Sequence, residues 1–208
     1  MHTLTHSARG FGRALALSGL ALLAALSLGG CSANRGAAPT QLDLGAGVAT
    51  PKAALPANPA IAVPVASGAA LLNEVRVIWR VGDQGQPQAY ATFQWVAPPA
   101  HLVTQRIIDR LALQGAVLPQ NVGGELPQLR MNLQRFEQTF SADGATSKGQ
   151  LTMQVVLVRG SRVSDQLLID LQVPATTQDA PGGAVALRTA TEQAADQIAQ
   201  WLSKQLAK

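Results

Sequence analysis

Hydrophobic side chains occupy every second position in several runs of this chain from residue 74 onward, and turn residues separate the runs. The alternating runs span 74–81, 88–97, 129–140, 149–159 and 166–173. Side chains of a strand point alternately to its two faces, so each run predicts a strand with one buried face. Short Gly-containing links predict hairpins, and hairpin-linked strands form antiparallel sheets.

Within the first of these strands the predicted inward stripe is Val75, Val77, Trp79 and Val81. Two shorter apolar pieces come earlier in the chain. The piece 41–45 is predicted as a short strand. The piece 61–65 is predicted as an edge strand or a strand end, because Pro64 lacks the N–H that an inner strand needs.

Two segments have the apolar period of an amphipathic helix. The first is 100–114, with its apolar stripe at Ala100, Val103, Ile107 and Leu111. Its predicted water-facing residues are Thr104, Gln105, Asp109 and Arg110, and Gly115 is the predicted stop. The second is the C-terminal segment after the predicted loop 181–183, with its stripe at Ala194, Ile198, Trp201 and Leu202. Together the elements predict an α+β fold, a two-layer sandwich of a mainly antiparallel sheet with both helices on one face.

The N-terminus has the pattern of an export signal. Residues 1–13 are polar and carry Arg9 and Arg13, and 14–30 are apolar and uncharged. This run is short for a transmembrane helix, which needs about 20 apolar residues. It ends in Leu28-Gly29-Gly30-Cys31, which resembles the lipobox of bacterial lipoproteins. We therefore predict that 1–30 is a signal peptide, cut between Gly30 and Cys31, and that Cys31 carries a diacylglycerol group and further acyl chains.

Cys31 is the only cysteine, so a disulfide within one subunit is impossible. A cleaved signal with an unmodified cysteine beside it is the alternative interpretation. The Ala-, Gly- and Pro-rich stretch 31–40 is predicted as a flexible tether, and 41–208 as the folded domain. Ser32 after the cysteine favours sorting to the outer membrane, with the domain on its periplasmic face.

From the charge pattern we do not expect the chain to bind nucleic acid. Removal of Arg9 and Arg13 with the signal lowers the formal net charge from +4 to +2. The remaining basic residues are scattered, whereas a nucleic-acid footprint needs a clustered basic patch.

Side chains that carry out catalysis are scarce. His2 and His6 leave with the signal, Cys31 is blocked by lipid, and His101 is the only histidine of the mature chain. A Cys/His zinc site within one subunit is therefore excluded, and a Ser-His-Asp site would have to use His101. The acidic residues form no evident catalytic pair. We predict no enzyme activity, no metal and no cofactor beyond the covalent lipid. The few aromatic residues are interpreted as core, or alternatively as an apolar groove for a lipid tail or a partner's edge.

Several segments in order resemble a known family. They are Leu42-Asp43-Leu44-Gly45, Trp79-Arg80-Val81, Tyr90-Ala91, Trp95 to Pro99, Arg110-Leu111-Ala112 with Gly115, Leu129 to Phe140, Asp179 to Gly183, and Trp201-Leu202. In this order and spacing the chain resembles the ABC-type transport auxiliary lipoproteins, the family of paraquat-inducible protein C. The resemblance covers nearly all of 41–206 and departs from the family at 46–74.

The resemblance implies an accessory lipoprotein. Its partners would be a mammalian-cell-entry (MCE) domain protein, a permease and an ATPase, in a system linked to lipid transport between the inner and outer membranes. Strand addition at a sheet edge is a natural docking mode, with Leu44 or Val63 expected on that edge. Phospholipid binding and self-association are left open. The alternative is another outer-membrane lipoprotein, for assembly of lipopolysaccharide or β-barrels, or a Tol-like structural domain.

Overall fold

The computed structural model describes residues 37–47, 55–119 and 126–207. Contacts divide the chain into a short unit, Met1–Ala38, and a compact unit, Pro39–Lys208. The helices and strands of the described residues lie in the second unit. The predicted signal peptide, its cleavage site and Cys31 lie outside the described residues.

Three long strands, β7 (Gln128–Phe140), β8 (Ser147–Arg159) and β9 (Arg162–Pro174), form an antiparallel meander. The predicted turn at 141–144 connects the first two. Each strand alternates as the sequence predicts, with buried residues such as Leu129, Met153 and Ile169 on one face. A register shift between Leu133 and Arg135 interrupts the ladder of β7 and β8, and it changes which side chains of β7 share a face.

The other edge of β7 pairs with several short segments in turn. β2 (Ile61–Ala62), β3 (Ser67–Gly68) and β4 (Arg76–Val81) all run parallel to it. β4 forms the predicted hairpin with β5 (Gln88–Trp95), β1 (Thr40–Leu42) joins β5, and β6 (Val117–Leu118) joins β2. The expectation of an α+β fold is confirmed, and the sheet is a mixed sheet of nine strands, because its long ladders are antiparallel and its short ones parallel.

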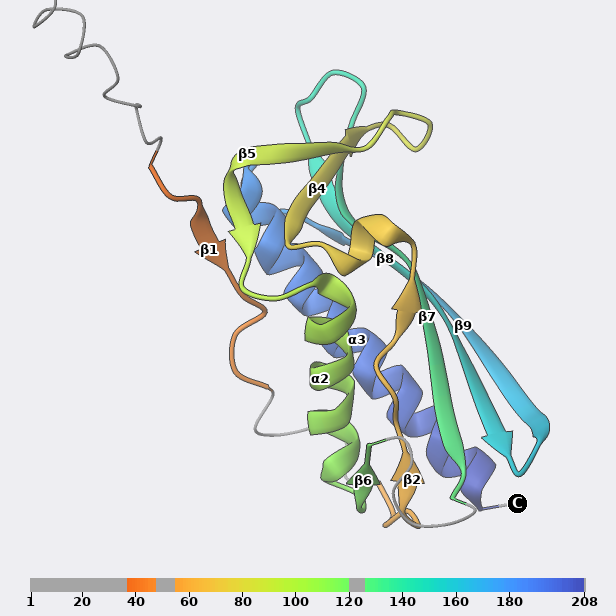
Figure 1. The fold of residues 1–208 in the computed structure, drawn as a ribbon. Helices are drawn as coiled ribbons and strands as arrows, with labels where there is room; N and C mark the ends of the chain where they lie inside the picture. The colour runs from red at the N-terminus through yellow and green to blue at the C-terminus, as the bar shows by residue number, and fades with distance from the viewer. Residues whose placement is uncertain (1–36, 48–54, 120–125, 208) are drawn as a thin grey trace, which may run out of the picture. The chain divides into compact units, whose positions relative to one another are not determined.

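Two α-helices complete the domain, together with a 3-10 turn, η1 (Ala70–Asn73). They are α2 (Pro99–Ala112) and α3 (Ala180–Leu206), which pack against each other. α3 also packs along β8 and β9, as Figure 1 shows. The predicted stripes are buried: Val103 and Ile107 on α2, and Ala194 and Ile198 on α3, have no exposed surface. The core therefore lies between α3 and the inner face of the long strands.

Two arginine side chains from the helices hold the segment that follows β1. Arg106 of α2 donates to the carbonyl oxygen of Leu44 at 2.6 Å, and Arg188 of α3 donates to that of Asp43 at 3.2 Å. Leu44 is buried and β1 ends at Leu42. The expectation that Leu44 lies on a sheet edge is therefore wrong. Val63 is also buried, and its N–H donates to the carbonyl of Leu118 at 2.9 Å, so it faces β6 instead of a free edge.

Four further expectations need correction. Val75 and Val81 are exposed whereas Ile78 is buried, because the pairing of β4 with β5 shifts register between Arg76 and Ile78. The piece 61–65 is not an edge, because β2 lies between β7 and β6, but it is a strand end, because β2 stops at Ala62 before Pro64. Gly115 does not cap α2, which already ends at Ala112.

The fourth correction concerns α2 itself, where Thr104 and Arg110 are buried instead of facing water. α3 packs against α2 at Arg110, whose Nε lies 2.6 Å from Asp196 Oδ1 of α3. The Thr104 hydroxyl donates to the carbonyl of Ala100 and accepts from the Ala66 N–H. The buried polar groups of Thr104 and Arg110 therefore both have partners, as burial requires.

The predicted loop 181–183 belongs to the first turn of α3. The Asp179 carboxylate caps the helix by accepting from the Gly182 N–H at 2.8 Å, and Pro181 stands where its missing N–H costs nothing. A Cβ at position 183 would lie 2.3 Å from Gln138 Oε1. Gly183 therefore leaves room for the Gln138 side chain between helix and sheet.

Candidate functional site

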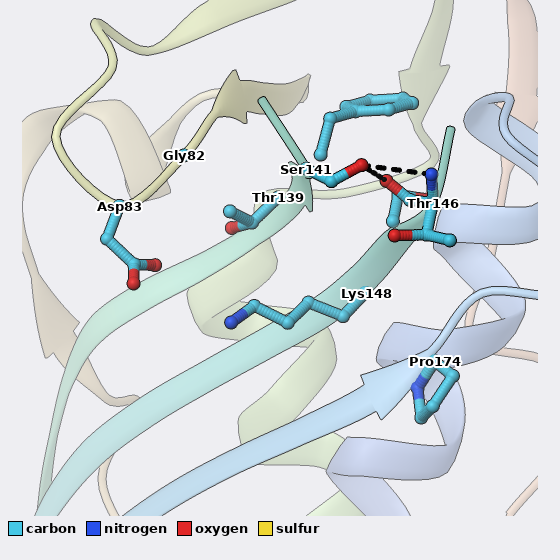
Figure 2. Close-up of a pocket in the computed structure, with 9 residues that line it drawn as sticks. Gly82, Asp83, Thr139, Ser141, Thr146, Lys148 and Pro174 are labelled. Atoms are coloured by element: carbon cyan, nitrogen blue, oxygen red, sulfur yellow. Dashed lines mark hydrogen bonds between the residues drawn. The ribbon is translucent and has the colours of Figure 1, made fainter. Parts of the chain in front are cut away.

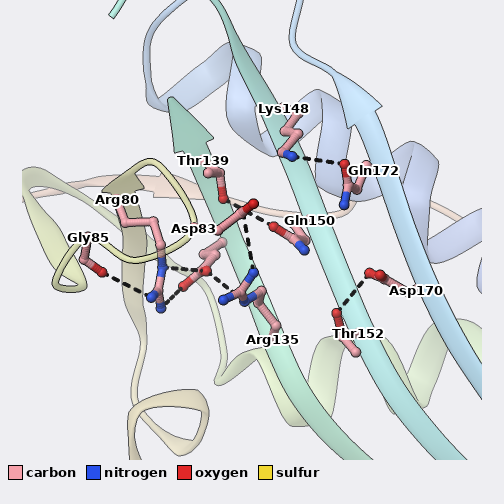
Figure 3. Close-up of polar contacts among 11 residues, drawn as sticks. Arg80, Asp83, Gly85, Arg135, Thr139, Lys148, Gln150, Thr152, Asp170 and Gln172 are labelled. Carbon is pink, nitrogen blue, oxygen red and sulfur yellow. Dashed lines mark hydrogen bonds and ion pairs between the residues drawn. The ribbon is translucent and has the colours of Figure 1, made fainter. Parts of the chain in front are cut away.

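Polar side chains gather on the face of β7, β8 and β9 that is turned away from α3, hereafter the outer face (Figure 3). Cross-strand hydrogen bonds connect them. Lys148 Nζ donates to Gln172 Oε1 at 2.8 Å, and the Thr152 hydroxyl donates to Asp170 Oδ1 at 3.0 Å. Such pairs stabilise a sheet modestly, by roughly 0.2–1 kcal/mol each. The outer face is therefore ordered, polar and not covered by either helix.

The most buried charge of the outer face is Glu137 of β7, which is 3% exposed. Arg80 of β4 lies against it, with Nε 2.6 Å from Oε1 and Nη2 donating to Oε2 at 2.7 Å. Arg135 Nε lies 3.1 Å from the same Oε1. The parallel pairing of Arg80 with Thr139 brings the first arginine beside the carboxylate. Arg135 and Glu137 are two residues apart and share a face, and the register shift in β7 turns that face outward.

The turn between β4 and β5 extends this cluster. Arg80 Nη1 donates to the carbonyl of Gly85 at 3.0 Å, which holds the turn over the sheet. Asp83 of the same turn lies 3.7 Å from Arg135 Nη1 and is exposed. Two guanidinium groups and two carboxylates therefore balance, and the cluster is neutral as a whole.

A hollow of about 530 Å³ opens next to this cluster (Figure 2). Its lining comes from three places: the β4–β5 turn with Asp83, the β7–β8 hairpin with Phe140 and Lys148, and Pro174 at the end of β9. Hydrogen bonds order the hairpin, because the Ser141 hydroxyl accepts from the Thr146 N–H at 3.0 Å. That hydroxyl also donates to Asp143 at 2.6 Å, and this hydrogen bond is the main cause that holds the pKa of Asp143 below its ordinary value.

The hollow offers one carboxylate, one ammonium group, several hydroxyl groups and a Phe ring. These groups can bind a polar or zwitterionic surface of a partner. His101 is exposed in the first turn of α2 and does not line the hollow. Among the described residues, no three His, Cys, Asp or Glu side chains stand close enough together to hold a metal ion.

A second hollow, of about 580 Å³, has a different character. Its lining is wholly apolar, from the segment 63–65, Ile108 of α2 and the segment 117–119. The aromatic residues do not form it. Trp95 and Phe136 are buried and pack together at a ring-centroid distance of 5.6 Å, which confirms their interpretation as core. The others, Trp79, Tyr90, Phe93, Phe140 and Trp201, are half-buried, and Phe140 lines the first hollow.

The sequence pattern did not predict the Glu137 cluster, because the acidic residues form no evident pair along the chain. The available signal was the irregular end of the run 129–140, where Phe136 breaks the alternation that Leu129, Met131 and Leu133 establish. A break of that kind indicates a bulge and a change of facing for the residues that follow.

Comparison with known proteins finds the fold elsewhere. No family model and no curated protein matches the chain. The crystal structure of protein XCC0632 from Xanthomonas campestris, of family DUF330, superposes with a TM-score of 0.66 at 19% identity, over 81% of this chain and 94% of that one. The crystal structure of an uncharacterised protein superposes with a TM-score of 0.63 at 14% identity, over 79% and 99%. At these identities the likeness shows the fold alone.

Neither helix in the described part of the chain has the length and hydrophobicity needed to cross a bilayer.

Proposed function

We propose that this chain is an accessory lipoprotein of an ABC transport system that contains an MCE-domain protein. Lipid on Cys31 would anchor it to the outer membrane, and the domain would face the periplasm. Its role would be to dock the conduit protein of the system and so support lipid transport between the two membranes. The chain would act by binding, without turnover.

The observation that carries the proposal is the polar outer face with its adjoining hollow. In a two-layer sandwich both helices cover one face of the sheet, and the other face is left for a partner. The charges there are held in place, because Glu137 lies between Arg80 and Arg135 and Lys148 is tied to Gln172. Preorganised polar groups at a surface favour specific binding, since little side-chain entropy is lost on contact.

The lipobox resemblance and the family resemblance support the same assignment. The segments that carry the family resemblance fall into ordered elements: Trp79-Arg80-Val81 in β4, Leu129 to Phe140 in β7, and Trp201-Leu202 in α3. The assembly-factor and Tol-like functions remain the competing outcomes of the experiment below.

The test is a pull-down of the tagged, lipidated protein from crosslinked envelopes, with partners and lipids identified by mass spectrometry. Recovery of an MCE-domain protein with its permease and ATPase supports the proposal. Recovery of a β-barrel assembly complex in its place would refute it. A Cys31→Ala variant of the full chain should lose both labelled palmitate and membrane association, and retention of the label would refute lipidation at Cys31.

Variants of the outer face test where docking occurs. Lys148→Glu reverses a charge in the hollow and should reduce recovery of the MCE-domain protein. Lys204→Glu is the matched control, because Lys204 is an exposed lysine on α3, away from the outer face. Equal recovery with both variants would show that the hollow is not part of the docking surface.

A further inference from the structure

The free edge of β9 is the feature of the fold that the proposed function leaves unused. Among the described strands, β9 pairs with β8 alone, over nearly its whole length of 13 residues. At about 3.3 Å per residue such an edge is roughly 43 Å long. Its outward backbone N–H and C=O groups have no strand partner within the described chain.

The other edges of the sheet are much shorter. β1 has three residues and β6 has two. Proteins usually protect a long edge with lysine, proline, a bulge or a covering element, because an unprotected edge adds strands from other chains. β9 contains no lysine, and its only proline is the last residue, Pro174. Its one bulge lies near the start of the strand, between Val163 and Asp165, so the edge from Gln166 onward pairs with β8 without interruption. α3 packs on the inner face of β9 and leaves its far edge uncovered in Figure 1.

Side chains along β9 add an apolar contact to this edge. Val163 and Leu168 are each 68% exposed, the highest values among the large hydrophobic residues in the described ranges. Leu168 lies on the outer face, where its neighbours Gln166 and Asp170 are polar. An exposed leucine in the middle of a free edge is a suitable contact for an apolar side chain of an added strand.

The charges of β9 select among the candidate occupants. The strand carries Asp165 and Asp170 against a single Arg162 at its start. Two copies of β9 side by side would bring four carboxylates together with two guanidinium groups. A strand that contains lysine or arginine would instead place a cation beside Asp170, and opposite charges across a ladder are stabilising.

We propose that β9 binds an extended segment of a partner protein by strand addition. The added strand places an apolar side chain against Leu168 and a lysine or arginine beside Asp170. This inference rests on the proposed function and adds the β9 edge to the outer face as a second docking surface, so the segment belongs to the conduit protein. Main-chain hydrogen bonds supply the affinity, and the side chains at Leu168 and Asp170 supply the register.

The test uses photo-crosslinking in cells that express the full lipidated chain. A photoreactive residue is placed in turn at Gln166, Leu168 and Asp170, and at Val185 of α3 as an exposed control. Crosslinked peptides are then sequenced by mass spectrometry. Strand addition predicts that the three β9 positions, each two residues apart, crosslink to partner residues that are also two apart in one extended segment. The control position Val185 should give no crosslink to that segment.

A blocking variant separates strand addition from a nearby contact. Leu168→Lys places a cation on the edge and should abolish the crosslink from Gln166 and Asp170, while Val185→Lys should leave it intact. Circular dichroism of both purified variants checks that they fold. Leu168→Val is a second variant, which retains an apolar strand-forming residue and should retain the crosslink.

The outcomes separate this inference from the proposed function. In-register links to the MCE-domain protein support both, whereas in-register links to a different envelope protein support strand addition and overturn the proposed function. Co-purification of the MCE-domain protein without any link from β9 overturns the inference and leaves the function standing. Links to β9 of a second copy overturn the assignment of the occupant, and the absence of any product from β9 overturns the inference.

Discussion

Replacing Glu137 with Gln should destabilise the domain more than its position on an outer face suggests. The side chain of Glu137 is 4% exposed and that of Arg80 is 16% exposed, so both charges of the pair are largely out of water. Arginine stays protonated at any ordinary pH. Loss of one partner from a buried pair costs about 3–5 kcal/mol, because the other charge stays buried without compensation. Arg135 keeps Asp83 at 3.7 Å, which favours the lower end of that range.

Urea unfolding followed by circular dichroism measures this cost. For a chain of this size, about 3 kcal/mol corresponds to a fall in Tm of roughly 6–12 °C. Glu74→Gln is the matched control, because it breaks the pair Glu74–Arg76 whose side chains are more than half exposed. Exposed pairs contribute about 0–1 kcal/mol, so this variant should unfold almost like the parent. Equal losses in the two variants would refute the reasoning that burial decides the cost.

Three further perturbations test other contacts of the fold. Gly149→Ala should destabilise the domain by about 1–3 kcal/mol, because its Cβ would lie 2.7 Å from the backbone nitrogen of Leu187 in α3, and an unchanged urea midpoint would contradict this close approach. Asp179→Ala should cost about 1 kcal/mol at pH 7 as a lost helix cap. The pKa of Asp179 lies below its ordinary 3.8, mainly because the Thr177 hydroxyl donates to the carboxylate and secondly because the Gly182 N–H does. The stabilisation is therefore present above pH 3.8 and is lost as the pH falls through the lowered pKa. An equal cost of the substitution at pH 7 and at pH 2 would contradict this reasoning. Burial, and secondly the charge of Asp179, raises the pKa of Tyr90 from 10.0 to about 12. The free energy of unfolding should therefore decline as the pH rises through this interval. An equal decline in the free energy of unfolding of a Tyr90→Phe variant would contradict the assignment to Tyr90.

The long strands and the buried faces of the helices could largely be predicted from the sequence, because each of these elements has a clear period of apolar residues. The strands β7 and β8 begin within two residues of their predicted positions, and the stripe from Ala100 to Leu111 is buried as predicted. Apolar residues at every second position can be buried together only on one face of a strand, and those at every third and fourth position only on one face of a helix. This is why the α+β class followed from the pattern.

Contacts between elements could not be predicted in the same way. Arg110 and Thr104 look like solvent residues of an isolated helix. They are buried because α3 brings Asp196 against Arg110 and the chain at Ala66 lies against Thr104. Gly182 and Gly183 look like a loop because glycine is unfavourable inside helices. The helix includes them because Asp179 caps it and the backbone must come close to the sheet at Gln138. In each case a tertiary contact overrides a local preference.

The candidate site depends on a still finer feature, the register shift between Leu133 and Arg135. Without that extra residue, strict alternation would place Arg135 and Glu137 on the face of Leu133, towards the core. With it, both turn to the outer face, where Arg80 arrives from a strand 57 residues earlier in the chain. A one-residue shift reverses the facing of every later side chain in a strand. Residues that could dock a partner on the outer face are therefore set by a bulge, whereas the inner face is set by hydrophobic burial, and only burial leaves a periodic signal in the sequence.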